Sequence, residues 1–270
     1  MTSTATVRRR LSQNLRRIRE RIHDASQRGG GEDEVTVVVV TKTAGMDVIR
    51  ALVEGGTGPL AESRAQELAR RAAMIEESIK RRSLLPPSTP QEVVAPAWHM
   101  VGHLQRNKVR HVLDWVDLIH SLDSLRLAEE IENQAARRSQ KVRVLLQVNT
   151  ADEPGKSGIA VGAASHLAEQ LRSLPHLEVC GLMTMGPQGA TEDRLRSVFL
   201  RTRELFDEIR KSRHASPSFD ILSMGMSEDF EVAVECGATM VRLGRIVFEG
   251  IGTNVDDSAK VPSGADVPSQ

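Results

Sequence analysis

One lysine stands where a buried strand is expected to end. Residues 35–41 read VTVVVVT, a continuous run that is typical of a strand buried on both faces of a parallel sheet. Lys42 follows directly, and a lysine in that position is costly unless it is paired, reaches water at the rim, or takes part in chemistry. A desolvated lysine can form a Schiff base with a carbonyl group. Position alone leaves two interpretations open, a reactive amine and an ordinary rim lysine.

A second group of glycines, hydroxyls and arginines lies on the last two expected strands and the loops that follow them. In α/β barrels these two loops often bind phosphate, since glycines expose backbone N–H groups and hydroxyl and guanidinium groups add donors. Glu228 and Asp229 are expected in the first turn of a helix, where they would repel phosphate, so the segment after the eighth strand is the better candidate. Because side chains alternate along a strand, the side chain of Arg245 is expected to point to solvent. The group consists of Ser223, Gly225, Ser227, Arg242, Gly244 and Arg245.

A lysine that faces a phosphate site matches the two ends of pyridoxal phosphate. The aldehyde of this cofactor forms a Schiff base with a lysine, while its phosphate is anchored at the other end. The sequence therefore predicts a pyridoxal phosphate pocket between Lys42 and the last two strands. The eight histidines include no HExxH or comparable pattern, so no metal site is expected.

The elements that must position these residues alternate between strands and helices. Eight βα units of this spacing favour a single (β/α)8 barrel, the TIM barrel, over an open doubly wound sheet. In such a barrel the residues that follow the strands meet at one end. The expected strands are residues 35–41, 59–61, 97–101, 116–119, 142–148, 177–183, 219–222 and 240–243, and the expected helices are residues 46–54, 63–82, 106–113, 123–138, 162–173, 191–212 and 228–236.

The chain is expected to divide into three segments. Residues 1–30 predict an amphipathic helix packed on the barrel, residues 31–251 the barrel itself, and residues 252–270 a disordered, polar tail. Residues 83–96 are proline-rich and predict an exposed loop. Arginines crowd the polar face of the first helix, which leaves binding to a membrane or a nucleic acid as an alternative role. We favour simple packing, because charged helix faces are usually just solvated.

Composition argues against several classes of protein. The chain has 270 residues with 36 Lys and Arg against 36 Asp and Glu, so its net charge implies no strongly electrostatic partner such as a nucleic acid. No apolar run reaches the ~18 residues that a membrane helix needs. Cys180 and Cys236 lie far apart without metal or redox spacing, which favours a reducing, cytoplasmic location.

Several longer motifs resemble those of the pyridoxal phosphate homeostasis proteins. They include VVVVTKT (37–43), WHMVGHLQRNK (98–108), HSLDS (120–124), GLMTMGP (181–187) and LSMGMSEDFEVAVECGATMVRLG (222–244). Members of this family are similar to the barrel domain of alanine racemase and lack its second domain. The resemblance implies an alanine racemase N-terminal domain-like barrel that holds pyridoxal 5'-phosphate as a Schiff base on Lys42. It further implies a role in intracellular homeostasis of the cofactor, without an established catalytic activity.

The resemblance also assigns residues to the site. Two positions and one loop depart from the common pattern of the family, and the loop is the proline-rich stretch of residues 83–96, which is expanded. Ser63 stands where Asn is usual, which shortens an amide contact, and Arg245 stands where Thr is usual, which exchanges a hydroxyl for a charge. Beside Lys42, the implied cofactor-binding residues are Ser63, His99, Asn149, Ser223, Met224, Ser227, Arg242, Gly244 and Arg245.

An enzyme, such as an amino-acid racemase dependent on pyridoxal phosphate, is the alternative function. Two-base racemisation in alanine racemase uses a tyrosine opposite the lysine, and this chain contains no tyrosine. By resemblance, Arg242 and Ser223, which also belong to the predicted phosphate site, stand near the ring end of the cofactor in place of a carboxylate, which would weaken the ring as an electron sink. We therefore expect a monomeric binding protein whose partners are pyridoxal phosphate and the apo-enzymes that use it, with no nucleic-acid or membrane partner.

Overall fold

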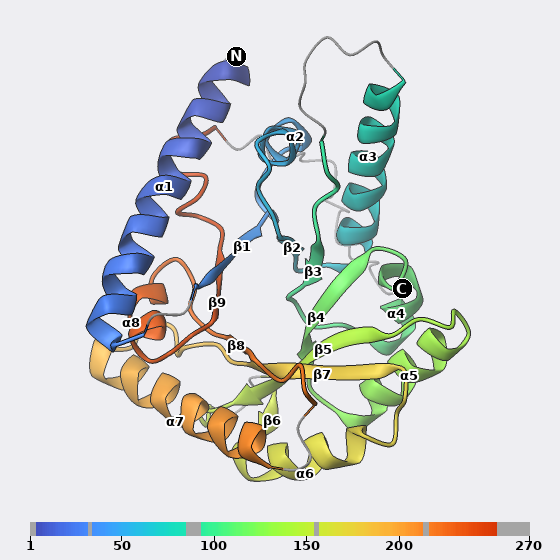
Figure 1. Cartoon of the computed structure of the whole chain (residues 1–270), viewed down its shortest axis with the longest axis vertical. Coiled ribbons are helices and arrows are strands. Elements are labelled where there is room, and N and C mark those ends of the chain that lie inside the picture. The colour runs from blue at the N-terminus through green and yellow to red at the C-terminus, as the bar shows by residue number, and fades with distance from the viewer. Residues whose placement is uncertain (1–3, 32–33, 85–92, 154–156, 213–215, 253–270) are drawn as a thin grey trace, which may run out of the picture.

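Parallel strands close into a ring at the centre of the molecule (Figure 1). The computed structural model describes residues 4–31, 34–84, 93–153, 157–212 and 216–252. Eight of the nine strands in this part of the chain pair in the order β4-β3-β2-β1-β9-β8-β7-β5, and a further pairing of β4 with β5 closes the barrel. They are β1 (Thr36–Val40), β2 (Leu60–Glu62), β3 (Trp98–Met100), β4 (Val116–Leu122), β5 (Val142–Asn149), β7 (Leu177–Met183), β8 (Ile221–Ser223) and β9 (Met240–Leu243). The predicted (β/α)8 barrel is confirmed.

Helices cover the outside of this barrel. Successive side chains of each strand point alternately outward to the helices and inward to the barrel axis. In β1, for example, Val39 packs in the large core under the helices and Val38 in the smaller core inside the barrel. The helices are α1 (Thr4–Gly29), α2 (Met46–Glu54), α3 (Ala65–Ser83), α4 (Val109–Val112), α5 (Leu125–Ala136), α6 (Val161–Leu171), α7 (Glu192–Lys211) and α8 (Phe230–Glu235).

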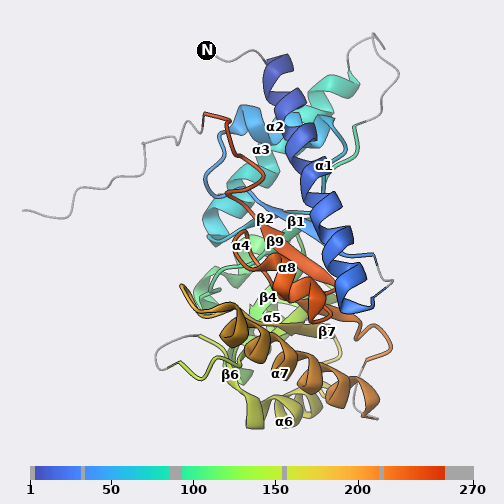
Figure 2. The same ribbon diagram turned by 90° about the vertical axis from the view of Figure 1, so that its left-hand side faces the viewer.

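The first helix, α1, lies against the barrel beside α2 and α8 (Figure 2). Its buried residues recur at helical spacing, and Ile18 is fully buried. Its arginine-rich face meets glutamates of the barrel in four ion pairs. These pairs are Arg8–Glu54, Arg17–Glu249, Arg21–Glu231 and Arg28–Glu235. Four of the arginines that suggested a nucleic acid or a membrane surface are thus engaged within the molecule.

The structure differs from the expected elements in three places. A two-residue strand, β6 (Ile159–Ala160), pairs with the end of β5, and two residues are too few to show a period. Residues 106–113 form a 3-10 turn, η1 (Arg106–Lys108), and the single turn α4 in place of one helix. The helix after Ser227 begins at Phe230, because Asp229 accepts a hydrogen bond from the N–H of Met226 at 2.6 Å and belongs to the loop.

Two expectations fall largely outside the described residues. These are residues 85–92 of the predicted loop and residues 253–270 of the predicted tail. Among the helices that the structure describes, none is long and apolar enough to cross a membrane.

Candidate functional site

A pocket of about 430 Å³ opens at the carboxyl ends of four neighbouring strands, β1, β9, β8 and β7. Chemistry in α/β barrels takes place at this end, on the loops that lead into the helices. The loop of residues 185–190 after β7 and the loop of residues 226–229 after β8 form two of its walls. The predicted site residues that the structure brings together in this pocket are Lys42, Ser227, Arg242, Gly244 and Arg245.

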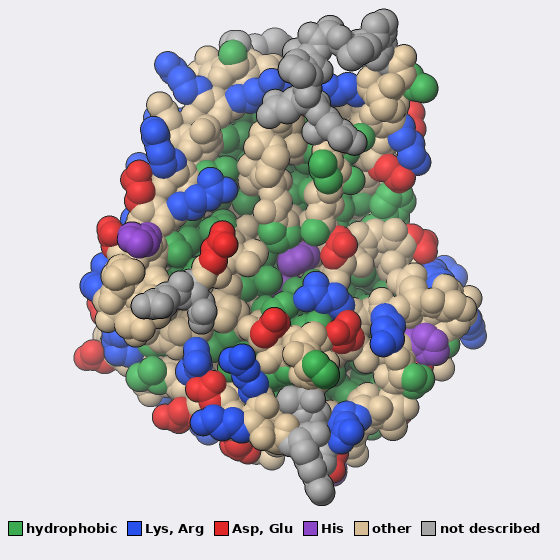
Figure 3. Space-filling view, viewed as in Figure 1, with side chains coloured by type: hydrophobic (Ala, Val, Ile, Leu, Met, Phe, Trp, Pro, Cys, Tyr) green, Lys and Arg blue, Asp and Glu red, His purple; other side chains and the backbone are tan. Residues whose placement is uncertain are grey.

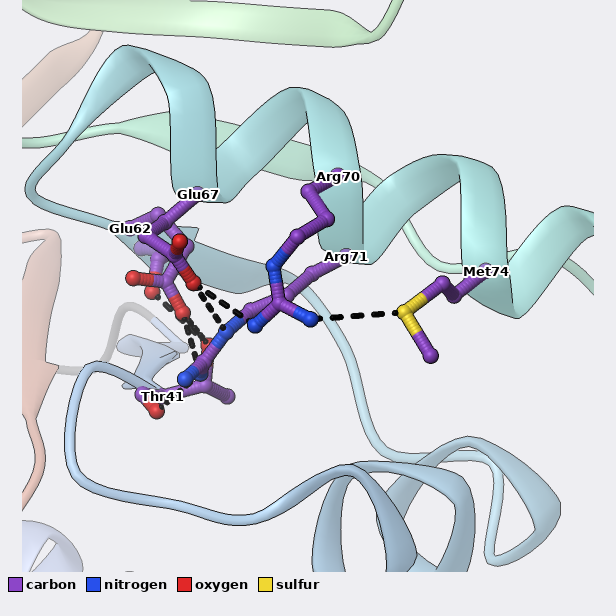
Figure 4. A network of polar contacts seen from close by, with 7 residues as sticks. Thr41, Glu62, Glu67, Arg70, Arg71 and Met74 are labelled. Atoms are coloured by element: carbon purple, nitrogen blue, oxygen red, sulfur yellow. Dashed lines mark hydrogen bonds and ion pairs between the residues drawn. The ribbon is translucent and has the colours of Figure 1, made fainter. Parts of the chain in front are cut away.

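The residue before Lys42 is held by a buried polar cluster (Figure 4). The hydroxyl of Thr41 donates to Glu62 at 2.5 Å, and the guanidinium of Arg71 donates both to Glu62 at 2.7 Å and to the carbonyl of Thr41 at 2.6 Å. The Arg71 and Glu62 side chains are only 11% and 2% exposed. Lys42 itself is exposed. The cluster therefore fixes the backbone from which the Lys42 side chain extends.

Glu62 is the member of this cluster with the highest electrostatic cost. Burial raises the pKa of its carboxyl group, and the hydrogen bond from Thr41 and the charge of Arg71 act against that rise. The two partners thus offset part of the cost of a buried carboxylate. The sequence analysis singled out neither Glu62 nor its partner Arg71 on α3.

Arg242 is a buried cation that reaches the pocket. It is 5% exposed, and it donates to Ser223 Oγ at 2.8 Å and to the carbonyl of Thr184 at 2.9 Å. Within the described residues it forms no ion pair within 4.0 Å. Burial lowers its pKa to about 10, against the opposite effect of the Asp229 carboxylate. A guanidinium with neutral partners at the wall of a cavity favours an anionic ligand.

The loop backbone supplies further donors. Gly225 has a φ of 95°, and a Cβ there would lie 2.7 Å from the Cβ of Ala233, so the turn after β8 needs a glycine. The N–H of Gly244 donates to the Ser227 hydroxyl at 3.4 Å. In the described part of the chain, the N–H groups of Ser227, Glu228 and Arg245 have no hydrogen-bond partner, and these residues line the pocket. Such N–H groups can bind an anion.

Glu228 and Arg245 form an ion pair of 2.7 Å at the edge of the pocket. Their side chains are 64% and 73% exposed, in agreement with the expected outward direction of Arg245. The expectation that Glu228 occupies the first turn of a helix was wrong, because it lies in the loop. Because Arg245 pairs with the Glu228 carboxylate, this negative charge is partly neutralised. The loops after β8 and β9 can therefore both contribute hydrogen-bond donors to the pocket.

Apart from Gly225, which shapes the turn after β8, five predicted site residues do not line this pocket. Ser223 is fully buried and bonded to Arg242 and His120, and Met224 packs in the core under the helices. His99 is buried and lines a different cavity, at the opposite end of the barrel. Asn149, at the end of β5, donates to the carbonyl of Glu153 at 3.0 Å. Ser63 is half-buried, and its carbonyl oxygen packs against Gly102. A Cβ added to Gly102 would lie 2.1 Å from that oxygen.

Two further polar residues were not assigned to the site from the sequence. Asp229 lines the pocket, where burial raises the pKa of its carboxyl group. His120 is fully buried inside the barrel and connects Ser223 to His99. A signal for His120 was present, since a histidine within an apolar strand is unusual, but its partners come from strands distant in sequence. Among the described residues no cluster of His, Cys, Asp and Glu could hold a metal ion.

Known proteins of similar sequence provide an independent comparison. Residues 9–250 match the family model of the alanine racemase N-terminal domain. The pyridoxal phosphate homeostasis protein of Aquifex aeolicus is 37% identical over 87% of this chain and 96% of its own length. The chain belongs to the pyridoxal phosphate homeostasis protein family. The member from Escherichia coli K12 is 31% identical over 88% of this chain and 95% of its own length.

Solved structures agree with this assignment. The structure of PipY from Synechococcus elongatus with PLP bound has a TM-score of 0.69 at 30% identity and covers 86% of this chain and 99% of PipY. An uncharacterised protein of Bifidobacterium adolescentis reaches a TM-score of 0.81 at 33% identity, over 92% of this chain and 98% of that one. Alanine racemase of Clostridium difficile has a TM-score of 0.60 at 16% identity, over 88% of this chain and 56% of the enzyme, and shares the fold alone.

The buried cluster before Lys42 predicts a specific loss of stability. Glu62→Gln leaves Arg71 without its closest charge partner and should lower the free energy of unfolding by about 1–3 kcal/mol. The control is Glu76→Gln, which removes an exposed pair with Lys80 on α3 and should lower the free energy of unfolding much less, because solvent screens exposed pairs. Urea denaturation measures both. Equal losses in the free energy of unfolding would show that the buried cluster stabilises the fold no more than an exposed ion pair does.

Proposed function

We propose that this protein binds pyridoxal 5'-phosphate in the pocket beside Lys42, holds it as a Schiff base, and serves the homeostasis of this cofactor in the cell. The observation on which this proposal rests is the meeting of an exposed amine, Lys42, with a buried guanidinium, Arg242, in one pocket. An amine suits an aldehyde, and a desolvated cation without an ion pair suits a phosphate. PipY, which is bound to PLP in its structure, supports the same assignment.

The residues present fit the chemistry of the cofactor. When bound, pyridoxal phosphate supplies an aldehyde that condenses with an amine and a phosphate that carries about −1.5 to −2 charges at neutral pH. Arg242, the hydroxyl of Ser227 and the loop N–H groups supply donors for that anion. The exposed Arg245 adds positive charge, although Glu228 already neutralises part of it.

The sequence favours storage or delivery of the cofactor over catalysis. Racemisation needs a second base opposite the lysine, and this chain has no tyrosine to supply it as alanine racemase does. Binding alone needs no such base. We therefore propose a protein that retains pyridoxal phosphate and releases it, and not a catalyst.

The location and the partners of the protein are part of the same proposal. Cys180 and Cys236 are both buried and free, which suits a reducing compartment, and we propose the cytoplasm. We propose that the protein acts as a monomer and passes the cofactor to apo-enzymes. Mixing the loaded protein with an apo-enzyme should restore that enzyme's activity, while light scattering reports one copy per particle. Failure to reactivate, or a stable oligomer, would contradict this part.

Lys42 is predicted to be the residue that holds the cofactor. After incubation with pyridoxal phosphate and reduction with borohydride, peptide mapping should find the pyridoxyl group on Lys42, because among the described residues this is the one lysine that lines the pocket. Lys42→Ala should lose both the label and the visible absorption band. A label found mainly on Lys108 or another lysine would refute the assignment.

The buried arginine is predicted to matter more for retention than the exposed one. Arg242→Ala removes a desolvated charge and should weaken binding by roughly 10- to 100-fold. Arg245→Ala removes an exposed charge that Glu228 already pairs, so its effect should stay below about fivefold. Equilibrium dialysis of both variants measures this, with pyridoxal without phosphate as the control ligand. Parental affinity in both variants, or equal binding of pyridoxal, would place the phosphate elsewhere.

The alternative, a racemase, is favoured only by the shared fold with alanine racemase. We predict no turnover of L-alanine in the presence of pyridoxal phosphate, as measured by chiral chromatography. The control is a known alanine racemase in the same assay. Multiple turnovers that vanish in Lys42→Ala would overturn the binding-protein proposal.

A further inference from the structure

A row of hydrogen bonds crosses the interior of the barrel beneath the pocket. Arg242 Nη1 donates to Ser223 Oγ at 2.8 Å, Ser223 Oγ lies 3.0 Å from His120 Nδ1, and His120 Nε2 lies 3.0 Å from His99 Nδ1. These residues come from β9, β8, β4 and β3. Because β4 and β8 are not neighbours in the sheet, the contact between His120 and Ser223 spans the barrel.

The two ends of this row lie in different surroundings. Arg242 lines the pocket that contains Lys42. His99 lines a cavity of about 550 Å³ at the amino-terminal ends of the strands, together with Arg143 and Asp220. Figure 3 looks onto that end of the barrel and shows a hollow where charged side chains and a histidine lie among hydrophobic ones. His120 and Ser223 between the two ends are fully buried.

The direction of the row follows from the chemistry of Arg242. A guanidinium only donates, so Ser223 Oγ accepts from it. In the described part of the chain, His120 Nδ1 is the only acceptor that the Ser223 hydroxyl contacts, so the hydroxyl donates there. A neutral His120 then carries its proton on Nε2 and donates to His99 Nδ1. The opposite direction would leave the Ser223 proton without an acceptor in a buried site, which is costly.

Both histidines are suited to the neutral form that this direction needs. Burial, reinforced by the charge of Arg143, lowers the pKa of His99 to about 4. Burial together with His99 and Arg242 lowers the pKa of His120 well below its usual value. At neutral pH the row therefore contains one charge, the guanidinium of Arg242.

We propose that His120, supported by His99, is a positioning residue for the pyridoxal phosphate site, acting through Ser223 on Arg242. A serine hydroxyl alone can rotate, and donation to His120 fixes it with a lone pair toward the guanidinium. Ser223 and Thr184 thus engage two of the Arg242 nitrogens, and the remaining donors, which have no partner among the described residues, can face the pocket. This inference rests on the proposed function. It gives His120 and His99 a role in cofactor binding although neither residue lines the pocket.

Substitution of His120 tests the inference through retention of pyridoxal phosphate. His120→Leu leaves the Ser223 hydroxyl without its acceptor and should raise the dissociation constant by roughly 5- to 100-fold. His120→Asn keeps a polar group near the position of Nδ1 and should recover most of the affinity. The control His176→Leu removes a half-buried histidine that is bonded to Glu132 and is not a member of the row, and it should leave binding unchanged. Parental affinity in His120→Leu would overturn the inference.

Nitrogen-15 NMR of the parental protein provides a test that does not depend on a folded variant. At neutral pH His120 and His99 should both be neutral with the proton on Nε2. Addition of pyridoxal phosphate should shift the signals of both rings, and Ser223→Ala should abolish the shift of His99. The opposite tautomers, or rings that do not respond to the cofactor, would contradict the positioning role. A parental protein that gains no borohydride-stable label would instead refute the proposed function itself.

Discussion

The pairing of β1 with β9 is the constraint on which the pocket depends. The two strands are parallel, and Val38 faces Arg242 in the register while Val39 faces Leu243. Their ends therefore emerge side by side, and Lys42 from the start of the barrel meets Gly244 and Arg245 from its end. No local sequence feature could bring these residues together, because only closure of the barrel makes the first and the last strand neighbours.

Burial of Arg242 gives the pocket its preference for an anion. A charge inside a barrel is costly unless it is compensated, and its partners in the described structure are a hydroxyl and a carbonyl. An anionic ligand would pair with this buried charge. Binding would therefore remove part of the electrostatic cost of burying Arg242, and that free energy would contribute to the affinity. The ion pair of Arg245 with Glu228 is exposed and contributes little by comparison. Burial, more than formal charge, therefore decides which of the two arginines contributes more to anion binding.

The sequence predicted the barrel and much of the pocket, and its failures have physical causes. The buried β-branched run of β1 and the regular alternation of elements were sufficient for the fold, since both depend on local periodicity. Lys42, Arg242 and Gly244 were found because they lie in or directly after the carboxyl-terminal parts of the first and the last strand. Arg71 and His120 were missed because each acts through a partner on another element, which only tertiary packing reveals. His99 was assigned to the site by resemblance, although the structure places it below the pocket, two hydrogen bonds from Ser223.

The central claim is that one pocket holds both ends of pyridoxal phosphate, with Lys42 at the aldehyde and Arg242 with the loops after β8 and β9 at the phosphate. A crystal structure of the protein grown with the cofactor tests this most directly. The account predicts continuous electron density from Lys42 Nζ to the cofactor, with the phosphate within hydrogen-bond distance of donors from Ser227, Arg242 or the 244–245 backbone. Density for the cofactor on another lysine, or in the cavity beside His99 and Arg143, would contradict it.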